Sequence, residues 1–350
     1  MAKPGARVLT QRELGRALLA RQMLLERVKA PLPRVLERMG GLQAQYAPSM
    51  YVGLWSRVEG FEREALTRAL ERRSVVQGTL MRSTIHLVSK SDYWPLVAAI
   101  REARRDAWRK YGQRGGLVKK MAPAAKRVRG RLREESPLPR SEMHDLLGGD
   151  SVITNGMNAW LDLVRMPPSG TWERRRADLF ALAEDWLGPE DASYDEGLEL
   201  LVRRYLGGFG PAPVRDIADW AGIPPKEINE GLRGLKLRRF RSEDGDELVD
   251  LPRAPLPDPD TPAPVRFLPT WDAALLVHAR RTGILPEEHR PKVFNVKTPQ
   301  SVPTFLVDGT VAGRWKFEKG RVALEPFGRL SASARKELGR EAERLAELHA

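Results

Sequence analysis

Two glutamines stand two residues apart in the stretch Gly-Gly-Leu-Gln-Ala-Gln, residues 40–45. In a helix such side chains point about 200° apart, whereas in an extended segment they lie on one face. Because a glycine pair favours a helix end, we expect residues 42–46 to be extended and Gln43 and Gln45 to face one site. A carboxamide offers one acceptor oxygen and two donor hydrogens, but it takes up no proton at neutral pH. The pair can therefore position a water molecule without acting as a strong base.

The composition excludes several kinds of chemistry. The 350 residues include no cysteine, which rules out disulfides, thiolate-held metals or clusters and a thiol nucleophile. The five histidines are scattered without metal-ligand spacing, so we expect no metal and no cofactor. No apolar run approaches the roughly 18–20 residues of a membrane span, and the N-terminus lacks the apolar core of a secretory signal. We therefore expect a cytoplasmic, nucleoid-associated protein that does not enter membranes.

The charge favours a polyanionic partner. The formal net charge is +13, and residues 101–140 alone contain 14 Lys or Arg against four acids. Phosphate contacts made by such a block release counterions, which favours nucleic acid binding. A solvated helix face is the alternative explanation of the block. Trp108 and Tyr111 lie among the arginines and could stack on bases, although anchoring in a core is the more frequent role of such rings.

Periodicity predicts an α+β chain that is mainly helical. Thr10 and Glu13 have capping-box spacing at the start of a helix predicted over residues 9–29. A short helix before Gly40 and a longer one over 62–79 precede a strand predicted over 81–89, with Met81, Ser83, Ile85 and Leu87 on one face. Helices followed by a β-ribbon have the order of a winged-helix unit.

Two further units follow the same order. The second is predicted to begin near Ser141, a candidate N-cap, and to include a helix over residues 177–188. The third has a helix-turn-helix pattern with its turn at residues 222–225, then a hairpin around Asp244-Gly245. Acidic residues at that hairpin tip would repel phosphates, so we expect the third unit to brace the fold more than it binds DNA.

The last part of the chain is predicted to be β-rich. Three β runs with turns at Asp308-Gly309 and residues 318–320 precede an amphipathic helix that begins at Ser331. The predicted division of the chain is 1–100 for the first unit, 101–190 for a basic helical region with the second, 191–255 for the third, and 265–350 for the β-hairpin region and the C-terminal helix.

Four stretches of the chain resemble the bacterial winged-helix DNA glycosylases of the AlkZ/YcaQ kind. They follow one another in the same order as in that family and cover residues 41–57, 79–89, 205–224 and 306–316. The resemblance implies tandem winged-helix units that form a concave basic surface on double-stranded DNA. It also implies a monomer that excises bulky N7-alkylguanines or unhooks interstrand crosslinks.

The family's catalytic signature is Gln, an apolar residue, then Gln or Asp, and it corresponds here to Gln43-Ala44-Gln45. The resemblance thus implies the Gln/Gln branch, typified by proteins that protect antibiotic producers from their own alkylating products. An N7-alkylated guanine is already cationic, so its base leaves neutral and the sugar can be captured by a positioned water. Strong base catalysis is then unnecessary, and unmodified bases are spared because they leave poorly.

Further DNA-binding candidates are basic residues near these motifs, and each has a structural alternative. Arg82 and His86 fall on one face of the predicted strand, and His86 could equally be a core residue. Arg57 could contact DNA or form an ion pair, the latter being slightly favoured. Trp315 lies on a predicted β-hairpin of the kind that the family uses near the lesion, and it is predicted to be a core residue. Its neighbours Arg314 and Lys316 would then point the other way, toward DNA. The remaining candidates are Arg174, Arg175, Arg176, Arg314 and Lys316.

The leading hypothesis is a monofunctional DNA glycosylase that acts on bulky or crosslinking N7-alkylated purines. A winged-helix regulator without catalytic activity is the main alternative, supported by the helix-turn-helix in the third unit. A glycosylase for small alkyl adducts is the third hypothesis. It would use the same glutamine pair with a tighter pocket.

Overall fold

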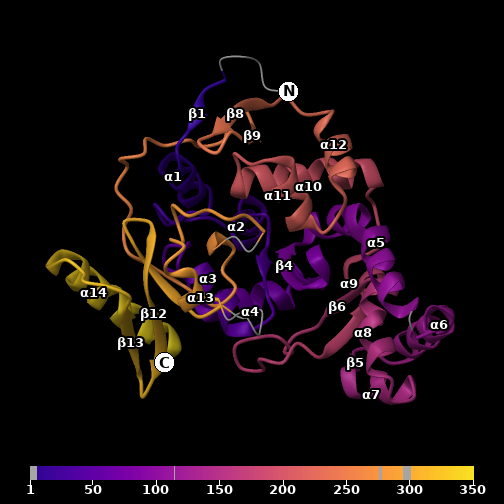
Figure 1. Cartoon of the computed structure of the whole chain (residues 1–350). Coiled ribbons are helices and arrows are strands. Elements are labelled where there is room, and N and C mark those ends of the chain that lie inside the picture. Colours follow the sequence, from indigo (N-terminus) through magenta and orange to yellow (C-terminus); the bar gives the residue numbers. More distant parts are fainter. Residues whose placement is uncertain (1–5, 114, 276–277, 295–300) are drawn as a thin grey trace.

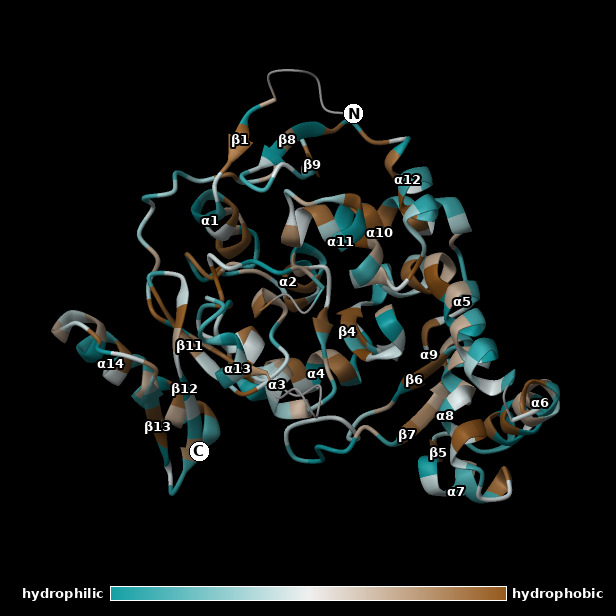
Figure 2. Ribbon diagram, viewed as in Figure 1, coloured by the Kyte–Doolittle hydropathy of each residue, from teal (hydrophilic) through white to brown (hydrophobic). Residues whose placement is uncertain are grey.

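The computed structural model describes residues 6–113, 115–275, 278–294 and 301–350, and helices dominate it (Figure 1). Three groups of elements, each with the strand and helix order of a winged-helix unit, precede a four-stranded sheet and a long terminal helix. Hydrophobic residues gather on the inward faces of the helices (Figure 2). Among the described residues no helix is long and apolar enough to cross a membrane.

In the first unit, a short strand and two helices lead into a sheet strand, two further helices, and two strands joined by a tight connection. The predicted capping box is confirmed, since Thr10 accepts from the amide of Glu13 and the Glu13 carboxylate accepts from the amide of Thr10. The elements are β1 (Val8–Leu9), α1 (Gln11–Arg21), α2 (Leu32–Met39), β2 (Leu42–Gln43), α3 (Ala47–Trp55), α4 (Arg63–Glu71), β3 (Val75–Thr79), η1 (Met81–Ser83) and β4 (Ile85–Ser89).

The second unit repeats this order after two long helices that carry the basic block. Trp108 packs edge-on against Trp160 at 5.1 Å, as expected of an anchor, whereas Tyr111 is exposed. Residues 166–178 join β6 to β7 and are called wing 2 below. The elements are α5 (Lys90–Gln113), α6 (Val118–Glu134), β5 (Leu138–Pro139), α7 (Arg140–Leu146), α8 (Ser151–Trp160), β6 (Leu163–Arg165), β7 (Leu179–Leu182) and α9 (Ala183–Leu187).

The first two units share one six-stranded sheet with the order β2-β4-β3-β6-β7-β5. Each half is a three-stranded sheet, consistent with a winged-helix unit, and the halves join edge to edge where β3 pairs antiparallel with β6. Gly78 permits the packing behind this seam, because a Cβ there would lie 2.7 Å from the ring of Tyr93. The seam fixes the two units to each other through backbone hydrogen bonds.

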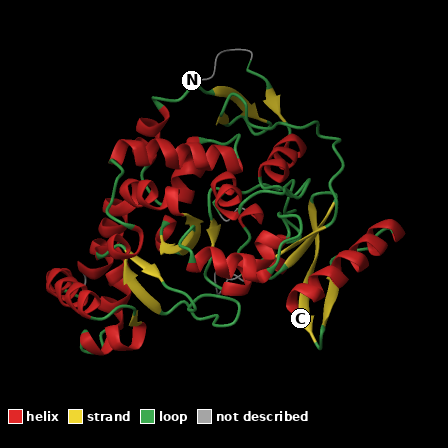
Figure 3. Cartoon of the chain, turned by 180° about the vertical axis from the view of Figure 1, so that it is seen from behind, coloured by secondary structure: helices red, strands yellow, loops and turns green. Residues whose placement is uncertain are grey.

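The third unit packs its first helix, α10, against α5. Figure 3 shows the chain from behind, with its helices in red. Its hairpin is confirmed, with Gly245 in the left-handed region at φ 86°. The acidic tip (residues 243–246, wing 3 below) binds the rest of the protein: Glu243 accepts from the Gln11 amide at 2.7 Å, and Asp246 pairs with Arg215 at 2.6 Å. The elements are α10 (Tyr194–Phe209), α11 (Val214–Ala221), α12 (Pro225–Leu232), β8 (Arg238–Ser242) and β9 (Glu247–Asp250).

The last part forms an antiparallel sheet in the order β10-β11-β12-β13, with α14 packed on β13. Both predicted turns are confirmed, and so is the start of the terminal helix at Ser331. Sequence reasoning missed β10, which is only three residues long. The elements are β10 (Arg266–Leu268), η2 (Ala273–Leu275), α13 (Arg290–Val293), β11 (Thr304–Val307), β12 (Thr310–Glu318), β13 (Arg321–Pro326) and α14 (Ala332–His349).

Several local predictions were wrong. The first helix ends at Arg21, and Ser141 lies inside α7, whose N-cap is Pro139. The helix predicted over residues 177–188 is strand β7 in its first half, because residues 179–182 pair with β6 and β5. The helix predicted over residues 62–79 ends at Glu71, and residues 75–79 form strand β3. The strand predicted over 81–89 begins only at Ile85, since the preceding residues form a 3-10 turn. The division at residues 100, 190 and 255 stays a prediction.

Candidate active site

Gln43 lies on a short strand whose partner fixes the direction of its side chain. Gly40 ends α2 in the left-handed conformation at φ 76°, so the chain turns into β2 as expected. Gln43 pairs directly with His86 on β4, and side chains of such opposed residues lie on the same face of a sheet. Among the described residues the Gln43 side chain has no hydrogen-bond partner, which leaves its acceptor oxygen available to a ligand.

The Gln43 side chain lines a small cavity, here called the Gln43 cavity. Its volume is about 20 Å³, which is room for a single water molecule. Its wall is formed by strands β2 and β4, by wing 1 (residues 80–84), by the third unit and by the segment around η2. The lining residues are Gly41, Gln43, Arg82, His86, Phe209, Trp220, Trp271, Asp272, Ala273 and His278.

His86 is a neutral member of this cavity. Burial, and then the nearby charge of Arg82, lower the pKa of His86 to about 3. Its Nδ1 lies 3.0 Å from the carbonyl oxygen of Thr84, which can only accept, so Nδ1 carries the proton and Nε2 has a free lone pair. His86 can thus accept a hydrogen bond in the cavity, but it is too weak a base to take a proton at neutral pH.

His278 and Arg82 approach the cavity from other elements. The Nε2 atom of His278 is buried without a partner among the described residues, and its ring packs against Tyr205 and Phe209. Burial, with Arg82 and Arg281 nearby, holds the pKa of His278 well below its usual value. Arg82 has φ 52° in wing 1 and donates to the carbonyl oxygen of Trp220. The prediction that Arg82 and His86 share a strand face was wrong, yet both line this cavity.

Gln45 does not line the Gln43 cavity. The chain bends after Ala44, and the Gln45 Oε1 atom accepts from the backbone amide of Ile85 at 2.9 Å. Because an amide donor requires the oxygen of the carboxamide, the Gln45 NH2 group is left to donate elsewhere. The structure therefore gives the two glutamines different free atoms: an acceptor on Gln43 and a donor on Gln45.

Arg57 is not a surface residue. Its guanidinium is fully buried and makes two hydrogen bonds, at 2.9 and 2.7 Å, with the buried carboxylate of Asp272. The assignment to DNA binding is corrected in favour of the ion pair. This pair also occupies the carboxylate of Asp272, the one acid among the described residues of the cavity wall.

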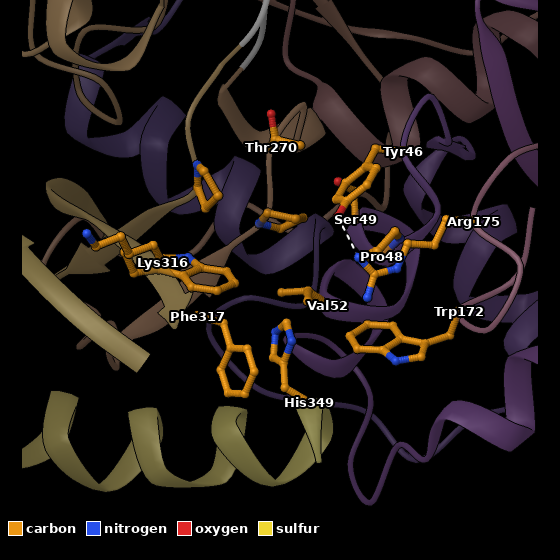
Figure 4. A pocket seen from close by; sticks show the side chains of 13 residues that line it. Tyr46, Pro48, Ser49, Val52, Trp172, Arg175, Thr270, Lys316, Phe317 and His349 are labelled. Carbon is orange, nitrogen blue, oxygen red and sulfur yellow. Dashed lines mark hydrogen bonds between the residues drawn. The ribbon is translucent and has the colours of Figure 1, made fainter. Parts of the chain in front are cut away.

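A second, larger hollow begins at the residue after Gln45. This aromatic pocket has a volume of about 290 Å³, and its wall combines α3 and the residue before it, wing 2, β12 and the end of α14 (Figure 4). Its lining residues are Tyr46, Pro48, Ser49, Val52, Trp172, Arg175, Pro269, Thr270, Pro303, Trp315, Lys316, Phe317 and His349.

The remaining predicted DNA contacts lie on wing 2 and on the β12–β13 hairpin. Arg174, Arg175 and Arg176 are all exposed; Arg174 pairs with Asp178 at 3.1 Å, and Arg175 donates to the Tyr46 hydroxyl. On the hairpin Trp315 is buried and donates to the carbonyl oxygen of Leu268, as predicted. Its neighbours Arg314 and Lys316 are exposed and pair with Glu325 and Glu318.

Comparison with known proteins assigns the chain to a family. The sequence pattern of the AlkZ-like DNA glycosylases matches residues 36–348, which is most of the chain. The chain belongs to the AlkZ-like DNA glycosylase family. Membership makes it an enzyme of the hydrolase class and removes the purely regulatory hypothesis.

A curated protein and a solved structure from one organism resemble this glycosylase. An interstrand DNA cross-link repair glycosylase of Streptomyces sahachiroi is 22% identical over 338 residues, which is 88% of each chain. The solved structure of the S. sahachiroi DNA glycosylase AlkZ aligns with a TM-score of 0.80 at 19% identity, over 97% of each chain. At this identity the structural likeness shows the fold, and that fold is the predicted α+β class.

Sequence reasoning missed half of the site. His278, Trp220 and Trp271 lie far from Gln43 in the sequence and carry no motif that connects them with it. Trp172 and His349 in the aromatic pocket were not singled out either. Among the described residues no group of three or more His, Cys, Asp or Glu side chains could hold a metal ion.

Proposed function

We propose that this glycosylase hydrolyses the N-glycosidic bond of N7-alkylated purines with bulky or crosslinking substituents in double-stranded DNA. Gln43 and Gln45 position the attacking water. The observation that supports this most directly is the Gln43 cavity, which has room for about one water beside a carboxamide with a free acceptor oxygen.

The proposed reaction begins with a base that is already cationic. The C1′–N9 bond breaks, and its electron pair goes to the base, which leaves neutral. The sugar gains oxocarbenium character, the water oxygen bonds to C1′, and the water's second proton goes to solvent. The product is an abasic site.

The site offers little base strength and does not need more. The Asp272 carboxylate is held by Arg57, and the pKa of His86 is about 3, so neither is a free general base at neutral pH. Gln43 Oε1 and His86 Nε2 are acceptors for the water's hydrogens. The exposed Gln45 NH2 group lies outside the cavity wall and is a donor to the sugar, so that it fixes C1′ relative to the water. Catalysis then comes from positioning, and the lesion supplies the leaving group.

The test uses a duplex with N7-alkylguanines and a duplex with a nitrogen-mustard crosslink, followed by alkaline cleavage of abasic sites. Wild-type protein should produce strand breaks at guanines. Gln43→Ala/Gln45→Ala should bind the same duplex in a gel-shift assay and lose excision by about 100-fold or more.

Gln113→Ala is the matched control, since Gln113 is an exposed glutamine at the end of α5. It should keep wild-type excision. Tight binding by the wild-type protein with no breaks on any alkylated substrate would refute the proposed reaction.

A further inference from the structure

The aromatic pocket has the chemistry of a stacking site. His349 lies between two rings: it stacks on Phe317 at 4.3 Å with an interplanar angle of 15°, and it meets the edge of Trp172 at 5.0 Å (Figure 4). Trp315 and Tyr46 add two more rings to the wall. Burial, with Arg175 and Arg63 nearby, lowers the pKa of His349 to about 4, so its ring is neutral at pH 7.

The pocket has few polar groups: two are buried inside it and two lie at its opening. The Oγ atom of Ser49 and the Nε2 atom of His349 are buried and have no hydrogen-bond partner among the described residues. Arg175 and Lys316 are exposed lining residues, so their charges lie at the opening. No acid is among the described residues of the wall. A planar, largely apolar group with one or two hydrogen-bonding atoms would fit inside, with phosphates near the opening.

The position of the pocket links it to the proposed reaction. Tyr46 follows Gln45 directly, so their Cα atoms are about 3.8 Å apart. The hydrogen bond from Arg175 to Tyr46 joins wing 2 to the segment that carries both glutamines. A base whose C1′ lies at the glutamines would therefore direct its substituent toward the rings.

We infer that the aromatic pocket binds the planar aromatic substituent on N7 of the adducted purine. This inference rests on the proposed function and adds the class of adduct, an alkyl group that ends in an aromatic ring system. An extruded purine fits the wall less well, because reading its Watson–Crick edge requires several placed polar partners. The volume of about 290 Å³ also exceeds the need of a methyl adduct.

The test compares release of N7-methylguanine and N7-benzylguanine from otherwise identical duplexes. Trp172 packs on Tyr51 in the core, and removing it risks unfolding, so the variants are Phe317→Ala and His349→Ala at half-buried positions. Each should lower kcat/KM for the benzyl adduct by about tenfold, the usual effect of losing one stacking ring. Release of N7-methylguanine should stay within about twofold of wild type.

Tyr194→Ala is the matched control, because Tyr194 is a partly exposed ring outside the pocket. It should leave both rates unchanged. Equal losses for both adducts in the two pocket variants would overturn the inference, and so would no loss for either. Release of neither base by the wild-type protein would overturn the proposed function itself, which separates the two failures.

Discussion

The Gln43 cavity and the aromatic pocket adjoin the same stretch of chain, residues 42–46. They differ in volume, in polar groups and in the elements that line them. Rings contribute to both walls. The first has a volume of about 20 Å³ and adds an unpartnered carboxamide, an arginine and an ion-paired carboxylate; the second has about 290 Å³ and no acid among the described residues of its wall. The first is lined by the first and third units and by the segment around η2, whereas the second needs wing 2, β12 and α14. The difference suggests a division of work: one hollow holds the nucleophile, and the other selects the adduct.

Filling the small hollow should give the largest effect. Ala273 lines the Gln43 cavity, and Ala273→Leu would displace the water without removing either glutamine. We expect excision of every adduct to fall about 100-fold, because misplacing a reacting group by about 1 Å has that effect. Single-turnover release of N7-methylguanine measures it.

Ala103→Leu controls for overpacking, since Ala103 is half-buried against the main core and lies outside the cavity. Both variants should lose about 1–3 kcal/mol of stability. A wild-type rate in Ala273→Leu would show that the water is held elsewhere.

The next effect concerns wing 2, the surface that we propose contacts DNA. Replacing Arg174, Arg175 and Arg176 with Gln should weaken duplex binding about tenfold or more at low salt. It should also reduce the slope of log affinity against log salt by about two units, because wing 2 would lose its phosphate contacts. Fluorescence anisotropy across a salt series gives both quantities.

A matched triple variant removes the same charge from the third unit, where Arg233, Arg239 and Arg241 are exposed. Its salt slope should stay close to that of wild type, because wing 3 is acidic and is bound to α1 and Arg215. Equal salt slopes in the two triple variants would mean that DNA binding depends on the overall charge of the protein and not on wing 2 in particular.

The smallest effect is a pH dependence of stability that belongs to the Gln43 cavity. The folded-state pKa of His86 is about 3, below the unfolded value near 6.5, so the unfolded chain takes up the proton first as the pH falls. Stability from His86 is complete above about pH 6.5 and is lost progressively toward pH 3, by about 3 kcal/mol at pH 4.5.

Urea unfolding of wild type and His86→Gln at pH 7 and 4.5 isolates this contribution, because the other titrating groups are common to both proteins. The loss on acidification should be smaller in the variant. Identical losses would mean that His86 is already accessible to protons in the folded state.

Local signals were enough for much of the fold. Thr10 with Glu13, Gly222, and the Asp-Gly pairs at 244–245 and 308–309 each fix a helix end or a turn within a few residues, and all are confirmed. The β3–β6 seam has no such signal, because it joins strands from two units. Residues 179–182 were assigned to a helix for the same reason: their partners lie elsewhere in the chain.

The site shows the same contrast between local signals, which the sequence reveals, and contacts between distant segments, which it does not. The stretch that carries Gln43 and Gln45 could be found from its motif and from the glycines before it. The burial of Arg57 could not, because its partner Asp272 lies 215 residues away. Arg82 lines the cavity because its backbone has a left-handed conformation, which no residue pattern predicts. His278 lies in a segment without any motif.

The seam between β3 and β6 also sets a length. Neighbouring strands lie about 4.8 Å apart, so the two outer strands of the shared sheet, β2 and β5, are separated by about 24 Å. This equals about seven base-pair steps of a duplex at roughly 3.4 Å each. Because backbone pairing fixes this span, substitutions of surface side chains should leave the distance between the two outer strands unchanged.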